Sequence, residues 1–122
     1  PLVMASHNDL GKLGEDLAGN YLLDSGYVIL ARNYMANKAE IDIIARKNNV
    51  LAIVEVKTRS TVTLGRPEEF LKPAQMKNLI GAVNFYVRDL DEELSIRFDI
   101  AAVVRNGNSY SLTYIEDAFY HF

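Results

Sequence analysis

Charged side chains interrupt two apolar segments of the chain in the same pattern. Glu40 and Asp42 stand in the segment EIDIIA, and Glu55 and Lys57 stand in the segment VEVKT. If residues 48–49, both asparagine, form a two-residue turn between antiparallel strands, residues whose numbers sum to 97 face each other. Asp42 then lies opposite Glu55, and Glu40 lies opposite Lys57. Because side chains alternate along a strand, all four share one face of the predicted hairpin.

The predicted pairing of Asp42 with Glu55 needs a neutralising partner. Two carboxylates about 5 Å apart repel each other by roughly 3 kcal/mol at an effective dielectric constant near 20. A raised carboxyl pKa, the ammonium of Lys57 or a bound cation can offset this repulsion. Mg²⁺ prefers carboxylate oxygens, with water and a substrate phosphate completing its shell. Lys57 could then orient an attacking water or stabilise charge on a phosphoryl transition state.

The same four residues have a purely structural interpretation, in which Lys57 pairs with Glu40 and Asp42 at a solvated strand end. The apolar neighbours make the pattern informative, because the charges interrupt both strands at matching positions. On the charged face Ile44 opposes Ile53 and Arg46 opposes Leu51; on the other face Ile43 opposes Val54 and Ile41 opposes Val56.

Asp42 followed by Glu55-Val56-Lys57 resembles the PD-(D/E)xK signature of the restriction-endonuclease-like nuclease superfamily. The whole pattern is similar to the YraN-like family of bacterial proteins, related to archaeal Holliday junction resolvases. This sequence has Ile41 where the superfamily has a proline before the first acid, and Ala39 where the family usually has a glycine before Glu40. The matching motifs are Gly14-Glu15, Gly26-Tyr27, Asn33, Glu40-Ile-Asp-Ile-Ile, Val54-Glu-Val-Lys-Thr-Arg and Arg97-Phe-Asp-Ile.

The resemblance implies a metal-dependent endonuclease that hydrolyses DNA phosphodiesters, on branched or on recombination and repair intermediates. Asp42, Glu55 and the backbone carbonyl of Val56 would bind Mg²⁺ or Mn²⁺, and Lys57 would be the catalytic lysine. Glu15 would project towards the metal as a ligand or through water, and Glu40 would also belong to the catalytic group.

Basic and amide side chains after the second charged segment are candidates for nucleic-acid binding. They are Arg59, Arg66, Lys72, Gln75 and Lys77. A small protein with acidic ends offers little area to a branched substrate, so a homodimer is expected for that activity. The alternative is a non-catalytic nucleic-acid or protein interaction module that keeps the nuclease fold.

The elements that must position these residues follow from hydrophobic spacing. Apolar residues at helical spacing predict a helix from Leu10 to Leu22 that stops at Gly26, and Pro73 starts a second helix with Met76, Leu79, Ile80, Val83 and Tyr86 on its core face. Strands are expected at 27–30, 41–45, 50–56, 96–104 and 110–115, the last two flanking Asn106-Gly107. The order α-β-β-β-α-β-β predicts an α/β fold, which the resemblance specifies as a restriction-endonuclease-like mixed central sheet flanked by helices. We expect Asp99, on the fourth strand, to be a structural hydrogen-bonding residue.

Composition limits the remaining possibilities. The 122 residues have a mass of 13.7 kDa, fit one domain over 1–122 and are 49% hydrophobic. The chain has no Cys and two His, which excludes disulfides, Cys-ligated metal sites and a Cys nucleophile. No apolar run approaches the roughly 20 residues of a membrane span, and no secretory signal begins the chain. We therefore expect a cytoplasmic protein without a membrane partner, with flexible residues 1–7 and with foreign residues before Met4.

Charge is divided unevenly along the chain. The net charge of −3 argues against a protein that coats nucleic acid non-specifically. Residues 32–77, however, hold nine cations and five anions, a net +4, whereas the rest of the chain carries −7. The predicted site therefore lies in a basic segment of an acidic protein.

Overall fold

The structure, a computed structural model, describes residues 7–60 and 72–118, with side chains from Leu10 onward. Two helices and five strands alternate in the predicted order α-β-β-β-α-β-β. Their bounds are α1 His7–Asp24, β1 Val28–Ala36, β2 Ala39–Lys47, β3 Val50–Arg59, α2 Pro73–Val87, β4 Ser95–Asn106 and β5 Ser109–Ile115. Within the described residues, no helix combines the length and apolar character that a membrane crossing would require.

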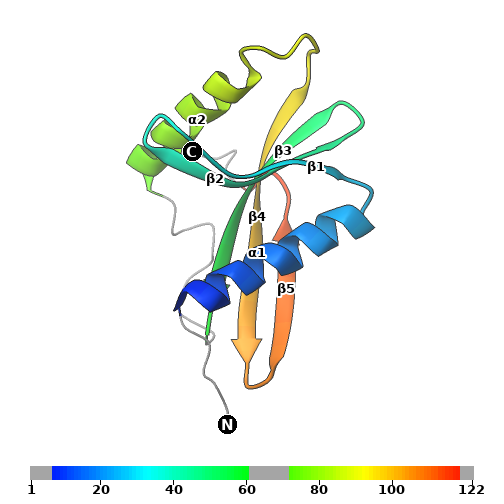
Figure 1. The fold of residues 1–122 in the computed structure, drawn as a ribbon, viewed down its shortest axis with the longest axis vertical. Coiled ribbons are helices and arrows are strands. Elements are labelled where there is room, and N and C mark those ends of the chain that lie inside the picture. The colour runs from blue at the N-terminus through cyan, green and yellow to red at the C-terminus, as the bar shows by residue number, and fades with distance from the viewer. Residues whose placement is uncertain (1–6, 61–71, 119–122) are drawn as a thin grey trace.

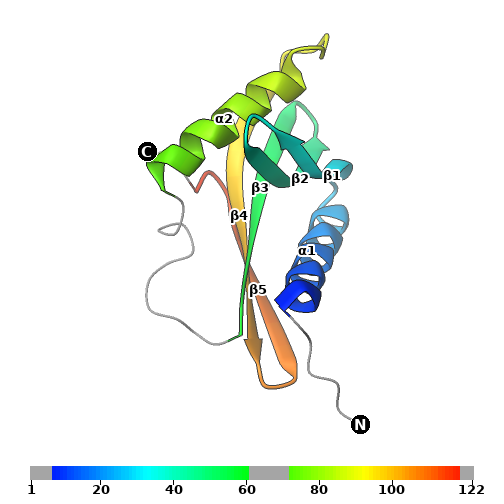
Figure 2. The same ribbon diagram turned by 60° about the vertical axis from the view of Figure 1, so that its left-hand side comes forward.

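The five strands form one mixed sheet in the order β1-β2-β3-β4-β5. β3 and β4 are parallel, because α2 lies between them in the chain, and the other neighbouring pairs are antiparallel. The two helices cover opposite faces of this sheet, as Figures 1 and 2 show. The predicted α/β class and the mixed sheet flanked by helices are therefore confirmed.

The predicted register between the second and third strands is also confirmed. Lys47 pairs with Val50, and the ladder continues to Ile43 and Val54, so paired residue numbers sum to 97. Asn48 begins the two-residue turn with a φ of 55°, a left-handed conformation that Asn tolerates better than most residues. Turn chemistry fixes this register, as the adjacent asparagines predict.

Each helix packs on its own apolar cluster. Ala18 and Leu22 of α1 pack with Ile43 and Val54 on one face of the sheet. On the other face, Met76, Leu79 and Val83 of α2 pack with Ile44 and Ile53. The expectation that Ile80 belongs to the α2 core face is wrong, because this side chain is 43% exposed. The buried residues of α2 are Met76, Leu79, Ala82 and Val83, so the core stripe passes through position 82 instead of position 80.

Most strands are longer than expected, and three differences bear on the site or the ends of the elements. β1 continues to Ala36, well beyond Leu30, because it pairs with β2 as far as the tight turn at Asn37 and Lys38. His7, expected in a flexible segment, is the first residue of α1; residues 1–6 lie outside the described residues. The β4–β5 turn is centred on residues 107–108, since Asn106 pairs with Ser109.

Asp99 is the fully buried acidic residue of the described core, and its carboxylate is well bonded. The N–H of Arg97 Nε is shared between both oxygens of the carboxylate, and Arg97 Nη2 donates to Oδ2, at 2.9–3.1 Å. Tyr114 Oη donates at 2.6 Å, and the backbone N–H of Asp117 donates at 3.0 Å. Arg97 also donates to the hydroxyl of Tyr27. The expected structural role of Asp99 is confirmed, because it ties β4 to β5 and to the segment after α1.

Replacing Asp99 with Asn should lower the free energy of unfolding by about 3 kcal/mol, because Arg97 loses its buried charged partner and keeps only the exposed Glu116, 3.5 Å away. Urea denaturation at neutral pH would measure this loss. Tyr114→Phe, which removes one donor to Asp99, should cost only about 1 kcal/mol. Equal unfolding midpoints for Asp99→Asn and the wild type would contradict a stabilising role of this network.

Candidate functional site

The predicted site lies where β2 separates from β3. Pairing between these strands ends at Ile43 and Val54, although β3 remains paired with β4 as far as Arg59. Beyond the last pair, the backbone N–H of Val56 donates to Asp42 Oδ2 at 2.7 Å. A carboxylate of β2 thus takes the place of a backbone acceptor. The sheet therefore opens at the residues predicted to do chemistry.

A distortion in β1 accompanies this opening. Asn33 has a φ of 53° and lies between the pairs Arg32–Ile43 and Tyr34–Ile41, alongside Asp42. Ile41 packs in the cluster beneath α2, whereas Ile43 packs beneath α1. The prediction that Ile41 shares the face of Ile43 is wrong, because the two side chains, although two residues apart in β2, pack in clusters on opposite faces of the sheet.

β3 supplies the second carboxylate and the lysine. Lys57 Nζ lies 3.1 Å from Glu55 Oε1, and both side chains are about one-fifth exposed. The purely structural interpretation, in which Lys57 pairs with Glu40 and Asp42, does not describe this ion pair. The predicted oppositions of Asp42 with Glu55 and of Glu40 with Lys57 are also wrong, since the β2–β3 ladder ends at the Ile43–Val54 pair. Glu55 and Lys57 nevertheless lie on one face, as their spacing predicts.

Helix α1 brings Glu15 to the same region. A Cβ atom on Gly14 would collide with Thr58 Oγ1, so glycine permits the close approach of α1 to β3 beside Glu15. Asn33 Nδ2 donates to Glu15 Oε1 at 2.8 Å and to Glu40 Oε1 at 3.2 Å. Carboxylates from α1 and β2 therefore meet at one amide group of β1.

Burial and mutual repulsion perturb the two inner carboxylates. The pKa of Asp42 is raised to about 7; burial is the largest cause, and repulsion from Glu55, Glu15 and Glu40 contributes to the shift. The hydrogen bond from Val56 acts in the opposite direction. The pKa of Glu55 is also raised, mainly by burial, although Lys57 opposes that shift. The structure thus gathers more negative charge than its own cations neutralise.

The donor chemistry fits a hard divalent cation. Asp42 and Glu55 are oxygen donors whose ionised forms are disfavoured by burial and by each other. Mg²⁺ commonly takes only one or two protein carboxylates, with water and substrate phosphate as its other ligands. Within the described residues, no group of three acidic or histidine side chains is arranged to hold a metal ion by itself. A cation here would therefore depend on ligands from outside the chain.

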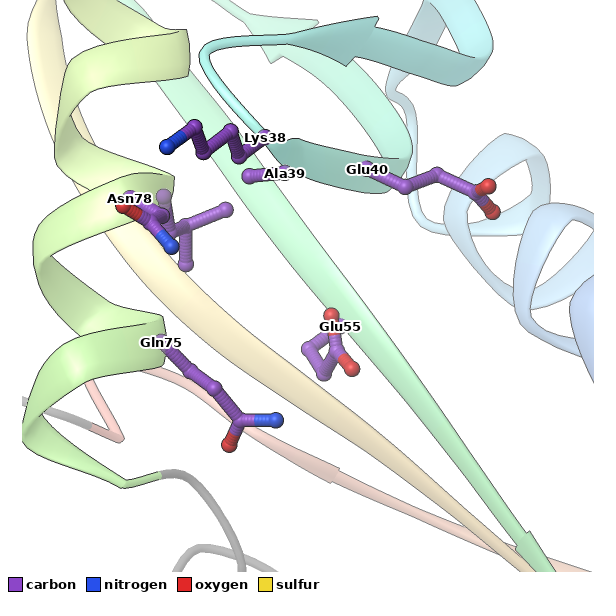
Figure 3. Close-up of a pocket in the computed structure, with 7 residues that line it drawn as sticks. Lys38, Ala39, Glu40, Glu55, Gln75 and Asn78 are labelled. Carbon is purple, nitrogen blue, oxygen red and sulfur yellow. The ribbon is translucent and has the colours of Figure 1, made fainter.

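A cavity of about 170 Å³ adjoins the carboxylates on the α2 side. Gln75 and Asn78 line it from α2, Lys38 and Ala39 from the β1–β2 turn, and Glu55 from β3. Figure 3 shows Lys38 extending towards α2, whereas the carboxylate of Glu40 points away from the cavity towards α1. The acidic cluster thus faces α1 through Glu40 and adjoins the cavity beside α2 through Glu55.

The predicted nucleic-acid-binding residues differ in their distance from this cluster. Gln75 lines the cavity, and its Oε1 accepts a hydrogen bond from the backbone N–H of Lys72 at 3.0 Å. Lys72 and Lys77 are exposed at the start of α2 but do not line the cavity. Arg59, at the end of β3, donates to the carbonyl of Thr58. Arg66 lies outside the described residues.

Asn33, Lys38 and Asn78 have no role that the sequence predicts, yet they border the acidic cluster or its cavity. In the sequence, Asn33 stands out only as part of a family motif. Its preference for left-handed backbone is shared by Asn37 and Asn48, which also have positive φ angles, so residue type alone gives no distinction. Lys38 and Asn78 come to the cavity only because the β1–β2 turn packs on α2, which the sequence does not reveal.

Comparison with known proteins places this arrangement in a bacterial family. Residues 14–103 match the model of "Uncharacterised protein family UPF0102", a range that contains every acidic residue of the cluster and Lys57. A UPF0102 protein of Flavobacterium psychrophilum is 55% identical over 119 residues, covering 98% of this chain and all of the relative.

Further relatives agree along nearly the whole length. A UPF0102 protein of Flavobacterium johnsoniae is 50% identical, covering 98% of this chain and all of the relative. One of Phocaeicola vulgatus is 39% identical, covering 96% of this chain and 97% of the relative. The family predicted from the motifs is confirmed: the chain belongs to the UPF0102 family.

Proposed function

We propose that this protein is a Mg²⁺- or Mn²⁺-dependent endonuclease that hydrolyses DNA phosphodiesters. The observation that carries the proposal is the pair of partly buried carboxylates, Asp42 and Glu55, at the opening between β2 and β3, with Lys57 beside them. Both acids have a raised pKa, so a positive charge would stabilise them together. The restriction-endonuclease-like resemblance of the motif supports the same chemistry.

Asp42 and Glu55 would hold the cation, and the carbonyl of Val56 is a third candidate ligand. Asp42 Oδ2 accepts from Val56, which fixes the carboxylate and leaves Oδ1 for a ligand. When bound, Mg²⁺ or Mn²⁺ supplies positive charge at the phosphate and lowers the pKa of water. Glu15 and Glu40 would act beside this pair as hydrogen-bond acceptors for ordered water.

Lys57 would act on the phosphate directly. Its ammonium is held 3.1 Å from Glu55, so its position is restricted at the edge of the acidic pair. From there it can donate a hydrogen bond to a phosphate oxygen or to an attacking water. Its stabilisation would increase as negative charge develops on the phosphoryl oxygens.

The DNA would approach over α2. Several cations of the basic segment are already engaged, as Arg32 pairs with Asp16 and Arg46 with Glu92. Among the described residues, Lys38, Lys72 and Lys77 make no ion pair, and they lie with Gln75 around the start of α2 and the cavity. Arg59 and Arg66 are further candidates for binding phosphates.

Two expectations accompany the proposed activity. The absence of Cys suits action in the reducing cytoplasm. A branched recombination or repair intermediate would exceed the surface of one 13.7 kDa chain, so that substrate class would be cut by a homodimer.

Asp42→Asn should stabilise the cation-free protein at alkaline pH. Between pH 4 and about 7 the folded state keeps a proton on Asp42 that the unfolded state has lost, so wild-type stability falls as pH rises. The stability difference between Asp42→Asn and the wild type should therefore grow from near zero at pH 4 to at most about 4 kcal/mol at pH 8. Urea denaturation in EDTA across this range would measure it.

Asp89→Asn is the matched control, because the Asp89 side chain is 83% exposed. Its stability relative to the wild type should show no rise over the same range. Mn²⁺ should stabilise the wild type at pH 8 but leave Asp42→Asn unchanged. A pH-independent difference between Asp42→Asn and the wild type would contradict the raised pKa of Asp42.

Asp42→Asn and Lys57→Ala should each reduce metal-dependent DNA cleavage by at least about 100-fold. The assay would compare linear, flapped and four-way DNA, with RNA of the same sequence, in Mg²⁺ and in Mn²⁺. Calorimetric titration of Mn²⁺ should show binding to the wild type and to Asp89→Asn, and none to Asp42→Asn. Undiminished cleavage by Asp42→Asn would refute this assignment of the site.

A different outcome would favour a non-catalytic interaction module with the same fold. In that case the wild type would bind DNA with strong salt dependence, show no turnover with either metal, and tolerate Lys57→Ala. This result would refute the proposed enzymatic activity but would support nucleic acid as the binding partner.

Removing the ammonium groups of Lys38, Lys72 and Lys77 together should weaken DNA binding and its dependence on salt. For duplex DNA, the slope of log affinity against log salt should fall by about 0.9 for each phosphate that a lysine no longer neutralises. Fluorescence anisotropy over a series of salt concentrations would give the slope. Arg88→Ala, at the other end of α2, should leave it unchanged, and equal slopes for all proteins would exclude this surface.

A further inference from the structure

Two carboxylates of the acidic cluster converge on one neutral side chain. Asn33 Nδ2 carries two hydrogens, and its donor distances are 2.8 Å to Glu15 Oε1 and 3.2 Å to Glu40 Oε1. These acids come from different elements, α1 and β2, and their charges repel each other. Within the described part of the chain, Asn33 is the hydrogen-bond partner of both. One amide therefore joins two acids of different elements at the solvent-exposed side of the cluster.

The backbone of Asn33 is suited to this position. Its φ of 53° is rare for a residue with a side chain, and Asn is among those that adopt it most readily. Asn33 also lies alongside Asp42, between the pairs on either side of it in the β1–β2 ladder. The same residue thus accompanies the opening of the sheet and provides the donor.

The neighbouring cations do not replace this amide. Arg32 Nη2 is held by Asp16 at 2.8 Å, and Lys57 Nζ by Glu55 at 3.1 Å. A cationic donor at position 33 would offset part of the negative charge of Glu15 and Glu40. A neutral amide fixes both carboxylates and keeps their full charge available to attract a cation.

We propose that Asn33 is a positioning residue that holds Glu15 and Glu40 as a pair beside Asp42 and Glu55. The free oxygen of each glutamate then accepts hydrogen bonds from water in the shell of the cation, which increases cation affinity. This inference rests on the proposed function, since it concerns the same site. It gives roles to Asn33 and Glu40 that charge and strand spacing alone do not.

Asn33→Gly removes the side-chain amide and leaves the backbone conformation in place, because glycine readily adopts a positive φ. Asn48→Gly is the matched control: Asn48 has a φ of 55° in the β2–β3 turn, away from the acidic cluster. Asn33→Gly should reduce Mn²⁺ affinity about 10-fold in calorimetric titrations, whereas Asn48→Gly should not change it. The two variants should have similar urea midpoints.

A double-mutant cycle distinguishes positioning from a general structural effect. In an E15Q/E40Q background, Asn33→Gly should cause no further loss of Mn²⁺ affinity, because the charged pair through which it acts is absent. An equal loss in both backgrounds would overturn the proposal. Unchanged affinity in Asn33→Gly alone would also overturn it.

A metal-free measurement keeps this inference separate from the proposed function. The side-chain NH₂ proton resonances of Asn33 should shift in Glu15→Gln and in Glu40→Gln, because each removes a charged acceptor. Resonances that match a solvated amide and move in neither variant would overturn the positioning of the pair. A wild-type protein that binds no Mn²⁺ would instead refute the cation site, while these resonances still decide whether Asn33 organises the two glutamates.

Discussion

The separation of β2 from β3 after the Ile43–Val54 pair is the constraint on which the candidate site depends. A backbone N–H at such a point needs an acceptor, and Asp42 provides one for Val56 at 2.7 Å. A continuous ladder would have satisfied this group with backbone and left no opening. Because the sheet parts here, carboxylates of β2 and β3 come close without being paired across a ladder, and α1 can add a third from outside.

Two aspartates in this small fold show opposite electrostatic environments. Asp99 is fully buried, but Arg97, Tyr114 and the N–H of Asp117 satisfy its carboxylate. Asp42 accepts a hydrogen bond from the N–H of Val56 and is repelled by three other carboxylates. The first stabilises the fold as it stands, whereas for the second one hydrogen bond does not offset burial and repulsion, so protonation or added positive charge would stabilise it. Local conflict of this kind is expected where a structure serves a ligand rather than its own stability.

How far the sequence predicts this structure depends on whether a feature is local. The β2–β3 register follows from adjacent asparagines between apolar strands, and the α2 core from its hydrophobic spacing. Regular alternation mispredicts the side of the sheet that Ile41 occupies, because the departure from alternation near Asp42 leaves no mark in the apolar spacing of β2. The position of Glu15 is implied only by family resemblance, since it depends on the packing of Gly14 against Thr58, far away in the chain. Strand spacing finds the two inner carboxylates, and tertiary contacts assemble the rest.

Charge balance couples the binding of a cation to the binding of a phosphate at this site. Glu15, Glu40, Asp42 and Glu55 interact with one another, and the ammonium beside them is that of Lys57, 3.1 Å from Glu55, so the fully ionised cluster has three negative charges in excess. A phosphodiester brings a further negative charge and would be repelled by the cation-free cluster. A divalent cation removes most of this excess and also attracts the phosphate. Under the proposed function, cation and DNA must therefore strengthen each other's binding, because each reduces a repulsion that opposes the other.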